Sequence, residues 1–118
     1  MTRILLLVDD EPRITDLLRL VLKRSFDEVH TATSGEAASE ILDEHPVTHV
    51  VADYVLGADE PNGATLLAAW RRIHPSIRFA AILTGRCSIE DLVGRPGIDA
   101  AFEKPAADEV IQRLRDEP

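Results

Sequence analysis

Five polar side chains in this 118-residue chain directly follow apolar runs, at positions where they could act together. They are Asp9 and Asp10 after the first run, Asp53 after the third, Thr84 after the fourth and Lys104 after the fifth. If the runs are neighbouring parallel strands, these residues share the carboxyl edge of one sheet, where α/β proteins bind ligands. We therefore expect one crevice that contains three carboxylates, a hydroxyl and an ammonium group.

Three crowded carboxylates repel one another unless a hard cation binds or some of them stay protonated. Mg²⁺ suits such a place because it prefers oxygen ligands and is commonly held by one or two carboxylates together with phosphate oxygens. Across the crevice, Lys104 would neutralise phosphoryl oxygens and the hydroxyl of Thr84 could hydrogen-bond another. The combination favours phosphoryl transfer, with a carboxylate as the acceptor.

The apolar patterns predict strands that alternate with helices. Ile4 to Val8 is an unbroken apolar run, which is typical of a strand buried on both faces. Further strands are predicted at 29–33, 49–52, 79–83 and 100–103. Helices are predicted after Pro12, after the N-cap Ser34, through the stripe that includes Trp70 and Ile73, around 89–93 and around 107–114. In the first helix the expected buried stripe is Ile14, Leu17, Leu18, Val21 and Leu22.

This alternation predicts a doubly wound α/β domain with a five-stranded parallel sheet and helices on both faces. The expected strand order is 2-1-3-4-5, the flavodoxin-like arrangement, because it places the first, third, fourth and fifth strands side by side. One domain is expected over residues 1–118, with no effector domain visible.

The segments "LLVDDEP", "VVADY", "ILTG" and "FEKP", in that order, resemble the receiver domain of two-component response regulators. The resemblance covers essentially the whole chain, and the loop after Asp53 is similar to that of receivers associated with hybrid histidine kinases. Four short motifs at the ends of the correct strands are far more specific together than any one of them alone.

The resemblance implies a role for each residue of the crevice. Asp53 would be the phosphoacceptor, and Thr84 and Lys104 would hold the phosphoryl oxygens. Mg²⁺ would be bound by Asp9, Asp10, Asp53 and the backbone carbonyl of Val55. The donor would be a histidine kinase or a phosphotransfer protein, and a downstream protein would be the target. The resemblance also implies a cis peptide bond between Lys104 and Pro105, which is physically accessible because X-Pro bonds make the cis form cheap.

One departure from the family leaves an alternative open. Receivers usually carry Tyr or Phe three positions before the active-site lysine, but this chain has Ala101 there and Phe102 one position later. Adjacent strand residues point to opposite faces, so Phe102 cannot substitute without a register slip. The alternative function is a receiver-fold interaction module with altered or lost switching. A third hypothesis, an aspartyl-phosphate phosphatase, needs a general acid two residues after the nucleophile, which Val55 cannot supply. We therefore expect no enzyme beyond the domain's own phosphorylation and dephosphorylation.

Charge and composition restrict the partners. A net charge of −8 argues against nucleic acid and anionic membranes as ligands. The single cysteine, Cys87, and the shortness of the first apolar run favour a cytoplasmic protein without a signal peptide or membrane span. The four histidines show no metal-like spacing in sequence and are predicted at the surface or at helix ends; they are His30, His45, His49 and His74.

Overall fold

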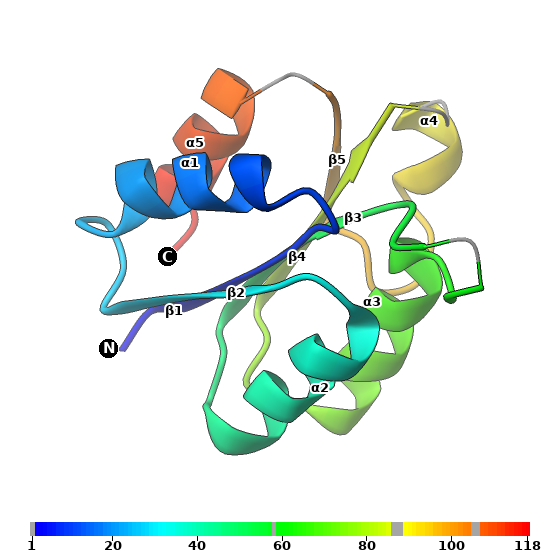
Figure 1. Ribbon diagram of the computed structural model, residues 1–118, viewed down its shortest axis with the longest axis horizontal. Coiled ribbons are helices and arrows are strands. Elements are labelled where there is room, and N and C mark those ends of the chain that lie inside the picture. Colours follow the sequence, from blue (N-terminus) through cyan, green and yellow to red (C-terminus); the bar gives the residue numbers. More distant parts are fainter. Residues whose placement is uncertain (1, 58, 86–88, 105–106) are drawn as a thin grey trace.

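The structure, a computed structural model, describes residues 2–57, 59–85, 89–104 and 107–118. In that part of the chain five parallel strands form one sheet in the order β2-β1-β3-β4-β5 (Figure 1). The strands are β1 (Ile4–Val8), β2 (Glu28–Ala32), β3 (His49–Asp53), β4 (Phe79–Thr84) and β5 (Ala100–Glu103). The helices are α1 (Pro12–Leu22), α2 (Gly35–Glu44), α3 (Gly63–Ile73), α4 (Ile89–Leu92) and α5 (Ala107–Asp116). The predicted doubly wound fold and its strand order are confirmed.

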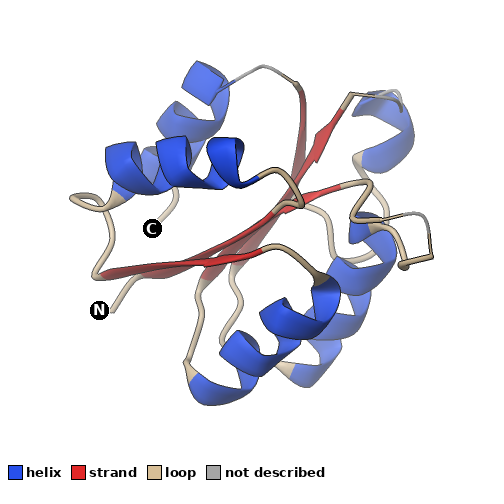
Figure 2. Ribbon diagram, in the orientation of Figure 1, coloured by secondary structure: helices blue, strands red, loops and turns tan. Residues whose placement is uncertain are grey.

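The sheet is the middle layer of three (Figure 2). Helices α1 and α5 cover one face, and α2, α3 and α4 cover the other (Figure 1). Alternate residues of β1 serve the two cores: Leu5 and Leu7 pack on the first side, whereas Leu6 and Val8 pack on the second. The unbroken apolar run of β1 is therefore explained by burial on both faces.

Local sequence signals start the helices. Pro12 is the first residue of α1, where its fixed φ angle and missing N–H cost nothing. The Ser34 Oγ accepts a hydrogen bond from the Ala37 N–H at 3.1 Å and caps α2. Asn62 caps α3 in the same way, through a 2.9 Å bond from the Thr65 N–H. These caps fix where each helix leaves the loop that follows the preceding strand.

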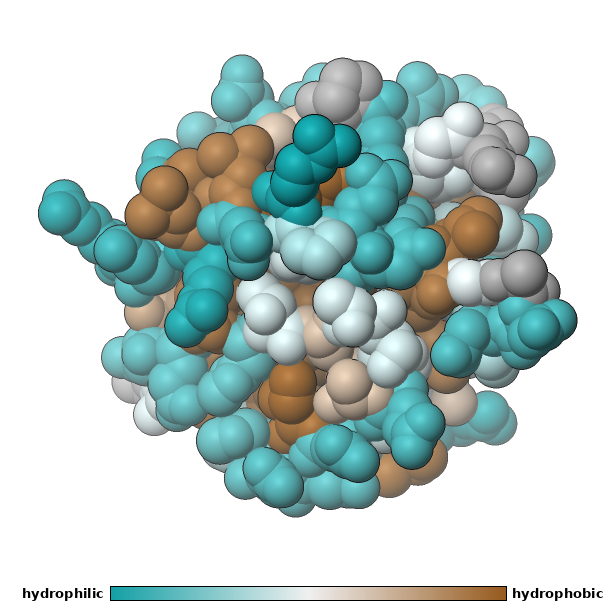
Figure 3. All heavy atoms as spheres, viewed as in Figure 1, coloured by the Kyte–Doolittle hydropathy of each residue, from teal (hydrophilic) through white to brown (hydrophobic). Residues whose placement is uncertain are grey.

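Two residues of the predicted buried stripes are exposed. Leu17 is 52% exposed because α1 buries Thr15, Leu18 and Leu22 instead. Thr15 tolerates burial because its hydroxyl donates to the Pro12 carbonyl at 3.0 Å. Apolar side chains accordingly gather on the outside of α1, on a face that is otherwise largely hydrophilic (Figure 3).

In α3 the buried face runs through Leu67 and Trp70, and its next position, four residues on, is the half-buried His74. Ile73 lies beside this face and is 67% exposed. Trp70 is core, as its place on the predicted stripe suggested.

The prediction of a surface position for His49 is wrong. His49 is fully buried in β3, with its ring 5.0 Å from that of Phe26 in an edge-on contact. Its Nδ1 lies 2.7 Å from the Thr48 Oγ1, and its Nε2 lies 3.3 Å from the Glu117 carbonyl. Burial lowers the pKa of His49 and so favours the neutral imidazole. Phe26 and Glu117, which contact this ring, are distant from His49 in sequence, so no local pattern could reveal its burial.

No helix in the described ranges is both long enough and apolar enough to cross a membrane.

We predict that Gly63→Ala destabilises the protein by about 1–3 kcal/mol, the usual cost of overpacking. A Cβ on Gly63 would lie 2.2 Å from the carbonyl oxygen of Asp53, a backbone atom that cannot move aside without displacing the end of β3. The Gly63 N–H also donates to the Tyr54 carbonyl at 2.8 Å, so the two segments are tightly joined.

Urea unfolding of Gly63→Ala and the matched Gly85→Ala tests this close approach. A Cβ on Gly85 would meet nothing within 4 Å, so little loss of stability is expected there. Equal unfolding free energies for the two variants would contradict the prediction.

Candidate functional site

The predicted residues meet at the carboxyl edge of the sheet. Strand register explains this, because Val8 is paired with Ala52, Asp53 with Leu83, and Thr84 with Glu103. Neighbouring strands therefore end at nearly the same level. A cavity of about 280 Å³ opens at this edge, and its lining residues are Asp10, Glu11, Asp53, Tyr54, Val55, Thr84, Gly85 and Lys104.

Lys104 connects the two buried carboxylates of the site. Its Nζ lies 3.0 Å from Asp53 Oδ2 and 3.1 Å from Asp9 Oδ2. Asp9 is 1% exposed and Asp53 is 6% exposed, whereas Asp10 is open to solvent. If all four groups are ionised, the three carboxylates and the one ammonium give this edge a net charge of −2.

The buried surroundings act on the protonation of these groups. Burial raises the pKa of Asp53, and the negative charge of Asp9 adds to this, while the hydrogen bond from Lys104 opposes both. For Lys104, burial lowers the pKa, but the bonds to Asp53 and Asp9 outweigh it and the net change is upward. Lys104 is therefore held as an ammonium ion beside carboxylates that it partly neutralises.

The three acids fit a divalent cation. Asp9, Asp10 and Asp53 each offer an oxygen, and these oxygens lie within 4.8 Å of one another. Asp9 Oδ1 accepts a hydrogen bond from the Glu11 N–H at 2.9 Å, which fixes the carboxylate. The buried Asp9 Oδ2 forms an ion pair with Lys104 but accepts no hydrogen bond of good geometry. This oxygen is therefore available to bind a cation or a water molecule of its hydration shell. Hard oxygen donors of this kind suit Mg²⁺.

Thr84 and Val55 complete the cavity wall. Thr84 ends β4, is 1% exposed and lines the cavity together with Lys104. Val55 follows Asp53 by two residues, and its N–H lies 3.4 Å from Asp53 Oδ1. Ligation of a cation by the Val55 carbonyl stays a prediction. The predicted cis peptide bond between Lys104 and Pro105 involves residue 105, which lies outside the described ranges, as do Arg86 and Cys87.

Ala101 and Phe102 lie on opposite faces of the sheet. Ala101 is buried in the core beneath α2, α3 and α4, while Phe102 packs against the core of α1 and α5. The pairing of Ala101 with Ile82 and Phe102 with Leu83 shows no register slip in β5. Phe102 does not take the place of the aromatic residue that receivers usually carry at the position of Ala101.

Sequence reasoning did not single out several residues of this edge, among them Tyr54 and Gly63. Tyr54 lines the cavity directly after Asp53, and Gly63 brings the start of α3 against the Asp53 backbone. The position of Tyr54 directly after the predicted phosphoacceptor, in "VVADY", indicates that it lies at this edge. The signal for Gly63 was a glycine directly after the helix cap Asn62, although only the packed structure reveals the carbonyl that it approaches.

The fold and this edge define a doubly wound α/β domain with an acidic, lysine-containing ligand site. The family model described as the response regulator receiver domain matches residues 5–115. The chain therefore belongs to the response regulator receiver domain family of two-component systems.

Individual proteins that are similar to this chain are also response regulators. The transcriptional regulatory protein GlrR of Escherichia coli K12 is 33% identical over 115 residues, which are 96% of this chain and 25% of GlrR. The two-component response regulator PprB of Pseudomonas aeruginosa is 32% identical over 107 residues, 86% of this chain and 38% of PprB. The chain thus spans between a quarter and two-fifths of these relatives.

Solved structures share the fold. A CheY-like receiver domain protein from Methanospirillum hungatei superposes with a TM-score of 0.84 at 22% identity, covering 98% of this chain and 93% of that one. The receiver domain of an HD domain-containing protein from Pseudomonas fluorescens superposes with a TM-score of 0.82 at 25% identity, covering 98% of this chain and 93% of that one.

We predict that Lys104→Met raises the pKa of Asp53 further. The substitution removes the ammonium that hydrogen-bonds Asp53, while burial and the charge of Asp9 still disfavour its carboxylate form. Carboxyl ¹³C chemical shifts followed against pH in Mg²⁺-free buffer report this pKa directly. Lys23→Met, at the exposed end of α1, is the matched control and should leave it unchanged. An Asp53 pKa that stays constant or falls in Lys104→Met would contradict the proposed charge balance.

Proposed function

We propose that this domain accepts a phosphoryl group on Asp53, in a Mg²⁺-dependent reaction, from the phosphohistidine of a histidine kinase or phosphotransfer protein. The observation that carries the proposal is the Asp53 carboxylate at the end of β3, 3.0 Å from the Lys104 ammonium and grouped with two further carboxylates. A carboxylate nucleophile, a neutralising lysine and an oxygen-donor cation site are the parts that phosphoryl transfer needs.

In the transfer step an Asp53 oxygen forms a bond to phosphorus as the bond between phosphorus and the imidazole nitrogen breaks. The electron pair of the breaking bond stays with the departing imidazole. Lys104 would move from the Asp53 carboxylate to a phosphoryl oxygen, a short displacement because both lie at one edge. The Thr84 hydroxyl would donate a hydrogen bond to another phosphoryl oxygen.

Asp9, Asp10 and Asp53 would hold Mg²⁺, with the Val55 carbonyl as a further ligand. When bound, the ion supplies positive charge that offsets the excess of carboxylates and the charge of the phosphoryl oxygens. Asp9 and Lys104 keep one another in place, so the cation side and the phosphoryl side of the crevice are linked by one ion pair.

Signalling would proceed through contacts with a downstream protein, in the cytoplasm. The net charge of −8 supports a domain that does not itself bind nucleic acid or anionic membranes. GlrR and PprB are named as regulators, but this chain spans only 25% and 38% of them, so their other activities are not carried over. The domain would be a phosphoacceptor rather than an enzyme that turns over a separate substrate.

A second candidate is a receiver-fold interaction module in which phosphorylation is uncoupled from output. The placement of Ala101 in one core and Phe102 in the other favours it, because no aromatic ring stands at the usual switching position. Comparison of oligomeric state or kinase binding before and after phosphorylation separates the two candidates. A phosphorylated protein that changes neither would favour the second.

Acetyl phosphate and Mg²⁺ are expected to add one phosphoryl group to the wild-type protein, measured by intact mass. Asp53→Asn should gain none, since the amide cannot act as the nucleophile, and EDTA should abolish the adduct on wild type. Asp43→Asn, an exposed acid on α2, is the matched control and should be phosphorylated normally. Wild type without an adduct, or Asp53→Asn with one, would remove the proposal.

The phosphoryl group is expected to be lost slowly, over minutes or longer. Val55 is apolar and 38% exposed beside Asp53, so it cannot orient an attacking water as a base would. Arg86 could further pair with phosphoryl oxygens. Val55→Gln should shorten the lifetime severalfold by positioning a water, whereas Val93→Gln, an exposed valine outside the site, should not. The decay of the adduct after removal of acetyl phosphate gives the rate, and a wild-type half-life of seconds would refute the expectation.

A further inference from the structure

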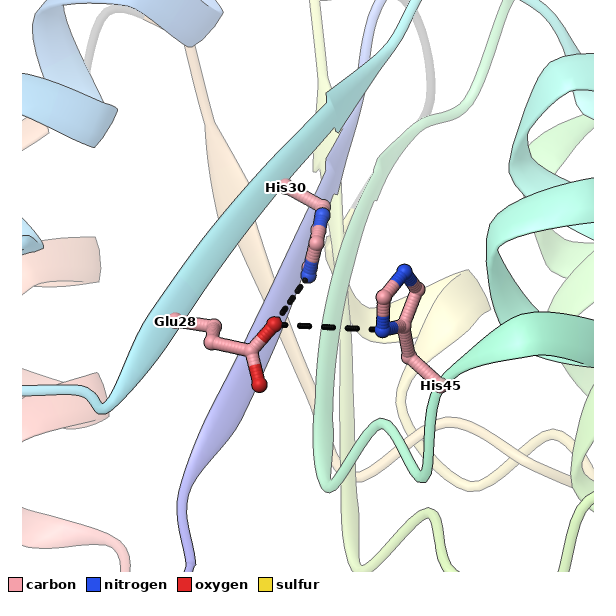
Figure 4. Close-up of side chains that lie close together, drawn as sticks. All are labelled: Glu28, His30 and His45. Carbon is pink, nitrogen blue, oxygen red and sulfur yellow. Dashed lines mark hydrogen bonds and ion pairs between the residues drawn. The ribbon is translucent and has the colours of Figure 1, made fainter.

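Three side chains that could bind a metal meet on the edge of the sheet (Figure 4). Glu28 and His30 come from β2, and His45 follows the last turn of α2. His30 Nε2 lies 2.9 Å from Glu28 Oε1, and His45 Nδ1 lies 3.8 Å from the same oxygen. The two imidazole rings are 4.3 Å apart at an angle of 30°.

The backbone holds this cluster in place. Glu28 and His30 are two residues apart on one strand, so their side chains share a face, the same face from which Ala32 enters the α2 side of the core. His45 is the C-cap of α2, and its N–H donates to the Ile41 carbonyl at 2.9 Å. Because α2 packs on this side of the edge strand, its last turn presents His45 to β2.

The ligand atoms have the right kind and spacing for a transition-metal ion. The three lie within 4.8 Å of one another. Two imidazole nitrogens and a carboxylate oxygen form a donor set that Zn²⁺ accepts, with water at the fourth position. Tetrahedral ligands about 2.1 Å from Zn²⁺ lie roughly 3.4 Å apart. The observed separations of 2.9 and 3.8 Å from Glu28 Oε1 bracket that value.

Solvent can reach all three groups, since the side chains of His30, His45 and Glu28 are 25%, 33% and 45% exposed. An ion could therefore enter without opening the core. We infer that Glu28, His30 and His45 form a Zn²⁺ site that links the edge strand β2 to the end of α2.

This site is separate in chemistry and in place from the acidic crevice. The crevice offers three carboxylates, the donors that Mg²⁺ prefers, whereas imidazole nitrogens suit Zn²⁺ and other transition-metal ions. The crevice lies at the carboxyl ends of the strands, while Glu28 begins β2 at the amino end. The inference therefore does not depend on the phosphoryl-accepting role of Asp53.

Calorimetric titration with ZnSO₄ tests the inference. The protein carries Cys87→Ser to remove its single thiol, and excess Mg²⁺ is added to compete with Zn²⁺ for the acidic crevice. One Zn²⁺ per chain is expected. Removal of a residue that only hydrogen-bonds a metal ligand weakens metal binding by roughly 10–100-fold. Because His30→Gln and His45→Gln each remove a ligand itself, each should weaken Zn²⁺ binding by at least about tenfold.

His74→Gln is the matched control. Like His45, His74 is a helix C-cap followed by proline, but it lies outside the cluster and the substitution should leave the Zn²⁺ affinity unchanged. Imidazole NMR of the protein with both histidines intact gives an independent readout, in which the His30 and His45 ring signals should shift with Zn²⁺ and those of His74 should not. No Zn²⁺ binding, or binding that survives both substitutions, would overturn the inference. So would Zn²⁺-induced shifts confined to other residues.

Discussion

The interaction on which the site depends is the contact of one ammonium with two buried carboxylates. Lys104 Nζ lies within 3.1 Å of both Asp9 and Asp53, which are almost completely withdrawn from water. Burial of two like charges side by side is costly unless a partner offsets it. One lysine offsets one of them, and Asp10 adds a third carboxylate at the rim. The folded sheet therefore holds an excess of negative charge, which a divalent cation or a protonated acid can relieve.

The rest of the fold makes this arrangement possible. Strands β1, β3, β4 and β5 are adjacent and parallel, so their carboxyl ends deliver side chains from distant parts of the chain to one edge. Apolar cores on both faces fix the level of each strand. Gly63 lets the start of α3 approach the Asp53 carbonyl where any side chain would collide with it. The acidic residues thus gain their close spacing from packing that lies outside the crevice.

The sequence predicted the strand order and the gathering of Asp9, Asp53 and Lys104, because parallel strands with polar ends leave a regular pattern. What it did not predict depends on contacts between distant segments. The His49 ring is contacted by Phe26 and by the Glu117 carbonyl, both distant in sequence. The helical period of 3.6 residues put Ile73 on the predicted stripe, but the packed face of α3 runs through Leu67 and Trp70 and leaves Ile73 beside it. The meeting of His30 with His45 joins a strand to a helix end. Their spacing along the chain carried no sign of it.

We propose that the excess carboxylates bind a divalent cation. Urea unfolding of wild type and Asp10→Asn, each in EDTA and in Mg²⁺, tests this proposal. Ligand binding to the folded state should raise the wild-type unfolding free energy by about 1.4 kcal/mol at ten times the dissociation constant. Asp10→Asn should be at least as stable as wild type in EDTA, because a repelling charge is gone, and should gain much less from Mg²⁺. The same Mg²⁺ gain in both proteins, or none in wild type, would contradict the claim.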